Sequence, residues 1–169
     1  MELTLSELDI ENTVLLDTNG YSRYRTHTKL LQLVPRETLL FRAVANDPSG
    51  ELHIGTVSLG AFRDDFVVVN GRDVTPARMR LMSLSQTFAA SDGRAYKWKV
   101  DSGQYTLVDD STKEVIAYFE RHFFLSSKTN KVHISNQGLP VLEEILATLI
   151  FMVAFQRRRK RRRDNGWVA

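Results

Sequence analysis

The chain has 169 residues, 43% of them hydrophobic and 25% charged, which excludes a disordered or fibrous protein and favours one globular domain. It contains no cysteine, so disulfides, thiolate catalysis and cysteine-ligated zinc or iron–sulfur sites are excluded. Residues 157–169 hold seven Arg or Lys and one Asp, a sum of +6, so the net charge of +3 leaves −3 for residues 1–156. A partner attracted by positive charge should therefore meet the C-terminal end.

The first residues do not resemble a secretory signal. Glu2 and Glu7 stand where a signal peptide carries basic residues, and no apolar segment follows them. The chain also has no Asn-x-Ser/Thr glycosylation acceptor. These features favour a cytoplasmic or nuclear location, with peripheral contact to membranes left open.

Residues 2–135 are predicted to form short strands separated by turns. Asn19-Gly20, Asn70-Gly71 and Asp92-Gly93 accept positive φ at low cost, as tight hairpin turns require. Thr75–Leu84 has no clear periodicity and is left unassigned. The expected strands are Leu3–Leu5, Thr13–Asp17, Tyr21–Thr28, Leu30–Val34, Leu39–Ala45, Leu52–Leu59, Phe66–Val69, Thr87–Ala90, Ala95–Val100, Tyr105–Asp109, Glu114–Phe119, His122–Ser126 and Lys131–Ser135.

Alternation within these strands indicates a sheet with one buried face. Tyr96 and Trp98 should point to the core, whereas Lys97 and Lys99 should point to solvent. About a dozen short strands at regular spacing are typical of a sandwich or an up-and-down barrel.

A helix is predicted over residues 139–156. Pro140 suits a first helical turn, and Glu143 and Glu144 favour the positive end of the helix dipole. Residues 145–155 are apolar on every side apart from Thr148, which indicates a helix buried all round rather than on one stripe. The expected buried positions are Ile145, Leu146, Leu149, Ile150, Met152 and Val153.

This helix has three alternative locations: inside the protein, in a membrane, or against a partner. The uninterrupted apolar run of eleven residues spans about 16 Å, short of a hydrocarbon core of about 30 Å. A barrel of about twelve strands is wide enough to enclose a helix of roughly 10 Å diameter. We therefore predict a mainly β protein: a closed antiparallel barrel of about 12 strands around a buried C-terminal α-helix. Residues 1–156 form the single domain, and residues 157–169 form a basic tail in which the helix frays.

The order of several motifs resembles a known group. These motifs are Phe88–Lys99, Tyr105–Asp109, Val115–Tyr118 and Ile145–Leu149 leading into Arg and Lys. The tubby C-terminal-like superfamily, which includes tubby, LURP-one-related and phospholipid scramblase proteins, closes many strands around one hydrophobic C-terminal helix. The chain is most similar to an uncharacterised fungal branch found in mushroom-forming species. That resemblance implies the barrel fold and assigns no function, and the basic residues with which tubby domains bind phosphoinositides have no match here.

Motifs for catalysis are absent from the sequence. It has no nucleophile elbow, phosphate-binding glycine loop, His-Glu-x-x-His or dinucleotide fingerprint. The histidines His27, His53, His122 and His133 are not spaced as a metal pair, and the acidic pairs Asp64-Asp65 and Asp109-Asp110 fit turn capping. We therefore predict a protein that is not an enzyme, with no catalytic residue, metal or cofactor.

The basic run is the remaining candidate site. It consists of Arg157, Arg158, Arg159, Lys160, Arg161, Arg162 and Arg163. It suits a solubilising helix cap, a nuclear import signal read by an import receptor, contact with anionic phospholipid or phosphoinositide, or, less readily, nonspecific nucleic-acid attachment. The favoured function is a binding module that engages anionic lipid head groups or another polyanion through this end. The alternative is a structural or interaction protein whose tail serves only import or solubility.

Overall fold

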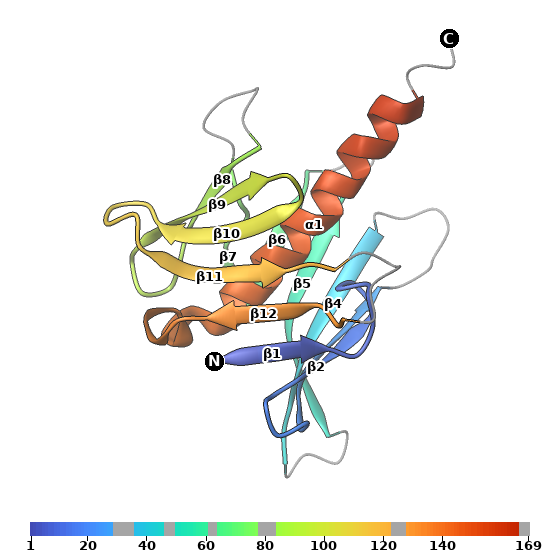
Figure 1. Ribbon diagram of the computed structural model, residues 1–169, viewed down its shortest axis with the longest axis vertical. Helices are drawn as coiled ribbons and strands as arrows, with labels where there is room; N and C mark the ends of the chain where they lie inside the picture. The colour runs from blue at the N-terminus through green and yellow to red at the C-terminus, as the bar shows by residue number, and fades with distance from the viewer. Residues whose placement is uncertain (29–35, 46–49, 61–63, 78–83, 123–127, 166–169) are drawn as a thin grey trace.

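The computed structural model describes residues 1–28, 36–45, 50–60, 64–77, 84–122 and 128–165 (Figure 1). Within them lie twelve strands, a 3-10 helix at Asn136–Val141 (η1) and one α-helix at Leu142–Asn165 (α1). The strands are β1 (Glu2–Leu5), β2 (Thr13–Leu16), β3 (Ser22–Thr28), β4 (Arg36–Ala43), β5 (Glu51–Leu59), β6 (Phe66–Val69), β7 (Arg72–Asp73), β8 (Gln86–Ala89), β9 (Ala95–Asp101), β10 (Gln104–Asp109), β11 (Val115–Glu120) and β12 (Lys131–Ile134).

All twelve strands belong to one antiparallel sheet, in the order β7-β6-β5-β4-β3-β2-β1-β12-β11-β10-β9-β8. Each neighbour is also the next strand in the chain, except where β1 pairs with β12 and joins the two meanders. Turn chemistry explains the hairpins: Asn70 and Gly71 both have positive φ, 49° and 77°, and connect β6 to β7. Twelve antiparallel strands and a C-terminal helix are thus confirmed.

The prediction of a closed barrel is wrong, because no ladder joins β7 to β8. In the described part of the chain, the two edges meet at one isolated bridge, where Ala77 and Thr87 exchange two backbone hydrogen bonds of 2.9 Å. Strand β7 is only two residues long. Before the bridge the chain is bonded to β6 instead: Val74 N–H donates to the Val67 carbonyl at 2.9 Å, and Val67 N–H donates to the Thr75 hydroxyl at 2.8 Å. The sheet curves around the helix and stays open along this seam.

Helix α1 runs through the concave side of the curved sheet and packs most extensively against β5 and β6 (Figure 1). The six positions expected in its buried core are each at most 1% exposed. They meet the inward residues of the strands, among them Tyr96 and Trp98, which are both fully buried, whereas Lys99 is exposed. By length and composition Asn136–Asp164 would suffice to cross a membrane, but 72% of its most apolar stretch is buried inside the protein. The buried helix and the inward residues of the strands together form the hydrophobic core.

Some boundaries differ from those expected. The segment before the helix is a 3-10 turn, and α1 continues nine residues beyond the expected end at Gln156, to Asn165. Strand β7 was missed because its two residues carry no periodicity. The expected strand Leu30–Val34 and residues 123–126 of His122–Ser126 lie outside the described residues, as do residues 78–83 of the unassigned segment.

Candidate functional site

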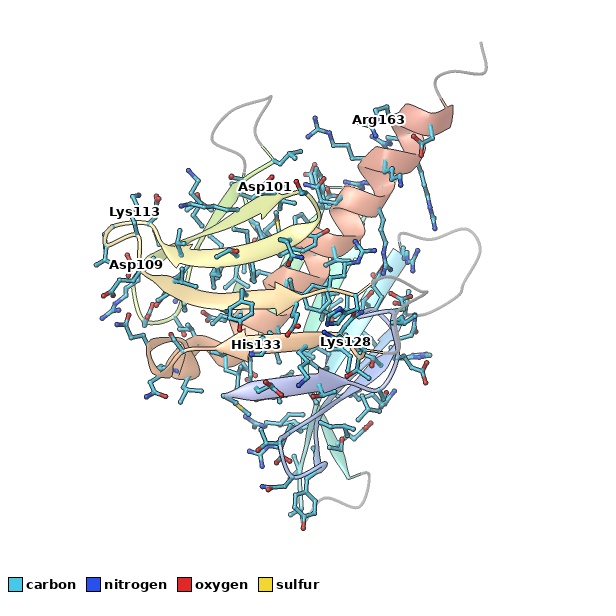
Figure 2. The ribbon with its side chains drawn as sticks, viewed as in Figure 1. Asp101, Asp109, Lys113, Lys128, His133 and Arg163 are labelled. Carbon is cyan, nitrogen blue, oxygen red and sulfur yellow. The ribbon has the colours of Figure 1, made fainter. Side chains whose placement is uncertain are left out.

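The basic run Arg157–Arg163 is the last part of α1 and extends beyond the strands (Figures 1 and 2). The structure continues the helix through this run to Asn165, whereas like-charge repulsion led us to expect it to end at Gln156. Residues one turn apart share a face of a helix. Arg157, Arg158, Arg161 and Arg162 form the inner face, which lines a hollow against the sheet, and Arg159, Lys160 and Arg163 form the outer face.

Arg157 attaches the helix to the loop between β1 and β2. Its Nη1 atom donates hydrogen bonds to Asp9 Oδ1 at 2.5 Å and to Glu11 Oε2 at 2.7 Å. Glu11 is buried, with 1% of its side chain exposed, and its Oε1 atom lies 3.0 Å from Arg36 Nε. A buried carboxylate thus lies between two guanidinium groups, which compensate its charge.

Burial and charge act in opposite directions on these groups. Desolvation raises the pKa of Glu11 above its ordinary value, although Arg36 and Arg157 oppose the rise. Desolvation also acts on Asp9, but the hydrogen bond and charge of Arg157 outweigh it and lower the pKa of Asp9. The same two carboxylates overcome burial at Arg157 and raise its pKa. Arg157 therefore stays charged while its partners are partly withdrawn from water.

Arg158 attaches the helix to the connection between β5 and β6. It forms a bidentate ion pair with Asp65, with Nη1–Oδ1 at 2.9 Å and Nη2–Oδ2 at 2.5 Å. Its Nη1 atom also donates to the carbonyl of Gly60 at 2.9 Å. Paired bonds of this kind fix the orientation of the guanidinium plane as well as its position. Two of the seven basic residues therefore hold the helix against the sheet.

The other five basic residues remain available to a partner. Within the described part of the chain, Arg159, Lys160, Arg161 and Arg162 make no hydrogen bond or ion pair. Arg163 lies 4.0 Å from Asp164, and both side chains are mostly exposed. Figure 2 shows Arg163 near the free end of the helix, away from the strands. The exposed charge is thus concentrated on the part of α1 beyond its attachments.

A hollow of about 250 Å³ lies between the inner face and the sheet. Leu59 and Ala154 contribute apolar surface to its floor, where they are 9% and 6% exposed. Arg36 and Glu11 complete the wall on the sheet side. The hollow is therefore lined by both apolar surface and guanidinium groups.

The opposite end of α1 is attached through carboxylates. Glu143 accepts hydrogen bonds from Arg42 at 2.8 Å and Asn70 at 2.7 Å. The backbone N–H of Ser91 donates to both carboxylate oxygens of Glu144, at 3.2 and 3.0 Å. Acidic groups at the first turn and basic groups in the later turns suit the helix dipole. Hydrogen bonds and ion pairs of these acidic and basic groups also connect both ends of the helix to the rest of the protein.

Other polar residues considered in the sequence make local contacts. His122 and His133, eleven residues apart, both contact Glu120, at 3.2 and 3.0 Å, because β11 and β12 are paired. Asp109 caps the turn after β10 by accepting from the backbone N–H groups of Ser111 and Thr112. Among the described residues, no group of three or more His, Asp or Glu could hold a metal ion.

The fold and site define a class of protein: a twelve-stranded antiparallel sheet around a C-terminal helix whose basic end extends beyond the sheet. A family model matches residues 8–161, so the chain belongs to DUF6593, a family of unknown function. No curated protein matches the chain. No solved structure matches it. The resemblance to tubby-like proteins stays a prediction.

Proposed function

We propose that this protein is a non-enzymatic module that binds anionic membrane surfaces through the basic end of α1. The observation that carries the proposal is a difference between two parts of the basic run. Arg157 and Arg158 are held by carboxylates, whereas the five cations after them are presented on a helical extension. Helix attachment alone needs only the first two.

The position of these cations suits an approach along the helix axis. Residues 1–156 sum to −3, so an anionic surface is repelled by the body and attracted by the extension. Each Lys or Arg near an anionic leaflet contributes about 1 kcal/mol. Five such residues give about 5 kcal/mol, which corresponds to a dissociation constant in the range of 0.1–1 mM. Binding of this kind is weak, reversible and screened by salt.

The apolar floor of the hollow favours a lipid surface over nucleic acid. Phosphate contacts along a nucleic acid need cations but no buried apolar surface, whereas Leu59 and Ala154 lie under the inner face. Anionic lipids are also enriched in the cytoplasmic leaflet, which fits the expected cytoplasmic location. Binding to nucleic acid remains an outcome of the test.

Flotation with vesicles tests the proposal. Wild-type protein should float with phosphatidylcholine vesicles that contain phosphatidylserine, should stay unbound with phosphatidylcholine alone, and should be released by added salt. The variant R159Q/K160Q should float several-fold less. K97Q/K99Q is the matched control, because it removes the same charge from the sheet surface and should float like wild type.

Four results would overturn the proposal. One is equal flotation of the two variants, and another is binding that is unaffected by phosphatidylserine. The third is salt-sensitive binding to duplex DNA or RNA without flotation, which would assign the basic end to nucleic acid. If full-length protein binds none of these surfaces, the import or solubility alternative accounts for the tail.

A further inference from the structure

The hollow beneath the inner face has the chemistry of a site for one small anionic amphiphile. Its walls are mainly apolar, and five arginines surround it: the four of the inner face and Arg36. Its volume of about 250 Å³ lies just below the range of roughly 300–1,000 Å³ typical of ligand pockets. A ligand that fits is therefore a single head group with a short apolar segment.

Charge compensation around the hollow is incomplete. Glu11 neutralises one guanidinium charge, shared between Arg36 and Arg157. Asp9 and Asp65 neutralise two more through Arg157 and Arg158. Five guanidinium groups against three carboxylates leave a charge of +2. The described residues supply no partner for Arg161 or Arg162, so the excess lies there.

The apolar residues at the floor of the hollow provide a contact for the apolar part of a ligand. Leu59 ends β5, and Ala154 belongs to α1 one turn before Arg158, so both are fixed by the core. The small side chain of Ala154 leaves space beneath the arginines that a larger residue would fill. Apolar groups that enter this space are removed from water, while an anion above them meets two guanidinium groups.

We propose that this hollow binds the anionic head and first carbons of an amphiphile that carries a phosphate monoester or carboxylate group. The inference deepens the proposed function and rests on the same basic end, because it adds a discrete site to a general attraction for anionic surfaces. The source of the amphiphile is either a membrane lipid or a free molecule in solution.

Calorimetric titration of the full chain with hexyl phosphate, below its micellar concentration, tests the site. Hexyl phosphate should bind at least about tenfold more tightly than inorganic phosphate, because roughly two buried methylene groups supply that factor. Hexanol, which lacks the charge, should not bind measurably. Equal affinity for hexyl phosphate and inorganic phosphate would show that the apolar floor plays no part and would overturn the inference.

Matched variants separate this site from the general charge. R161Q/R162Q should weaken hexyl phosphate binding more than tenfold, whereas R159Q/K160Q, which removes the same charge from outside the hollow, should leave it within about twofold. A154L should fill the hollow and abolish hexyl phosphate binding. Thermal unfolding must show that each variant is folded. Equal losses in the two double variants, or full binding by folded A154L, would overturn the inference.

The two proposals fail in different ways. Flotation without hexyl phosphate binding removes the discrete site and leaves the membrane proposal standing. Hexyl phosphate binding without flotation removes the membrane proposal and identifies a free amphiphile as the ligand. Release of vesicle-bound protein by excess hexyl phosphate would identify a membrane lipid as the natural occupant.

Discussion

Trp98 on β9 donates its indole N–H to the hydroxyl of Thr148 on α1, at 3.0 Å, inside the core. Both side chains are fully buried. The Thr148 hydroxyl in turn donates to the backbone carbonyl of Glu144 at 2.7 Å, so the indole, hydroxyl and carbonyl form a chain. The one polar residue in the apolar stretch of the helix is therefore the partner of the largest buried side chain. This bond fixes the rotation of α1 relative to β9.

Replacing Thr148 by Val should destabilise the protein. Valine keeps the shape and removes the acceptor, which leaves the buried Trp98 N–H without a partner at a cost of about 1–3 kcal/mol. Chemical denaturation followed by tryptophan fluorescence measures the free energy of unfolding.

A double-mutant cycle separates the bond from packing. W98F removes the donor, so T148V in a W98F background should cost less than T148V alone, by about 1 kcal/mol. Because W98F removes a fluorophore, circular dichroism is the common probe. Additive effects would show that the hydrogen bond contributes nothing beyond packing.

Gly138 is required by the close approach of three side chains. A Cβ atom there would lie 2.8 Å from Ile134 Cγ2, 2.9 Å from Ile116 Cγ2 and 3.0 Å from Ile145 Cδ1. G138A should therefore lower the free energy of unfolding by about 1–3 kcal/mol through overpacking. The matched control is Q137A, whose site is exposed and should change stability by less than about 0.5 kcal/mol. A thermal unfolding temperature of G138A equal to that of wild type would contradict this account.

Local signals in the sequence were sufficient for much of the fold. The Asn-Gly turn at Asn70 and the alternation around Trp98 depend on a few neighbouring residues, and both are present as expected. The all-round hydrophobicity of residues 145–155 indicated a helix surrounded by other elements, and the sheet surrounds it. Elements of strong periodicity are the ones that sequence alone predicts best.

Features that depend on contacts between residues far apart in the chain could not be predicted from the sequence. Barrel closure requires a ladder between β7 and β8, and only the structure shows that Ala77 and Thr87 form a single bridge. The helix was expected to end at Gln156 because the charges after it repel. The compensating carboxylate Asp65 lies on a distant connection and could not be assigned to Arg158 from sequence.

Asp109 should contribute to acid sensitivity. Hydrogen bonds from the Ser111 hydroxyl and from the backbone N–H groups of Thr112 and Ser111 hold the pKa of Asp109 below its ordinary value of 3.8. A carboxylate with a lowered folded-state pKa stabilises the protein above pH 3.8, and this contribution is lost as the pH falls through the folded-state value. Figure 2 shows Asp109 at the connection between β10 and β11, near Lys113.

D109N tests this contribution, because the amide oxygen can still accept the same hydrogen bonds. Wild type should be more stable than D109N at pH 6, and the difference should shrink as the pH falls from about 5 to 2.5. Thermal unfolding at half-unit pH intervals measures the difference. A gap that stays constant with pH would assign the effect to packing rather than to charge.

The basic run has two proposed roles, attachment of the helix and binding of anionic surfaces. Different single substitutions should affect each role. Arg157 compensates the buried carboxylate of Glu11, so R157Q should lower the free energy of unfolding by about 2 kcal/mol. Arg159 has no partner among the described residues, and R159Q should change stability by less than about 0.5 kcal/mol. Both variants lose one charge, but the charge of Arg157 is already paired with Asp9. Vesicle flotation should therefore fall more in R159Q than in R157Q, the reverse of the order in stability. If R157Q proved as stable as R159Q, the attachment of the helix through Arg157 would be refuted.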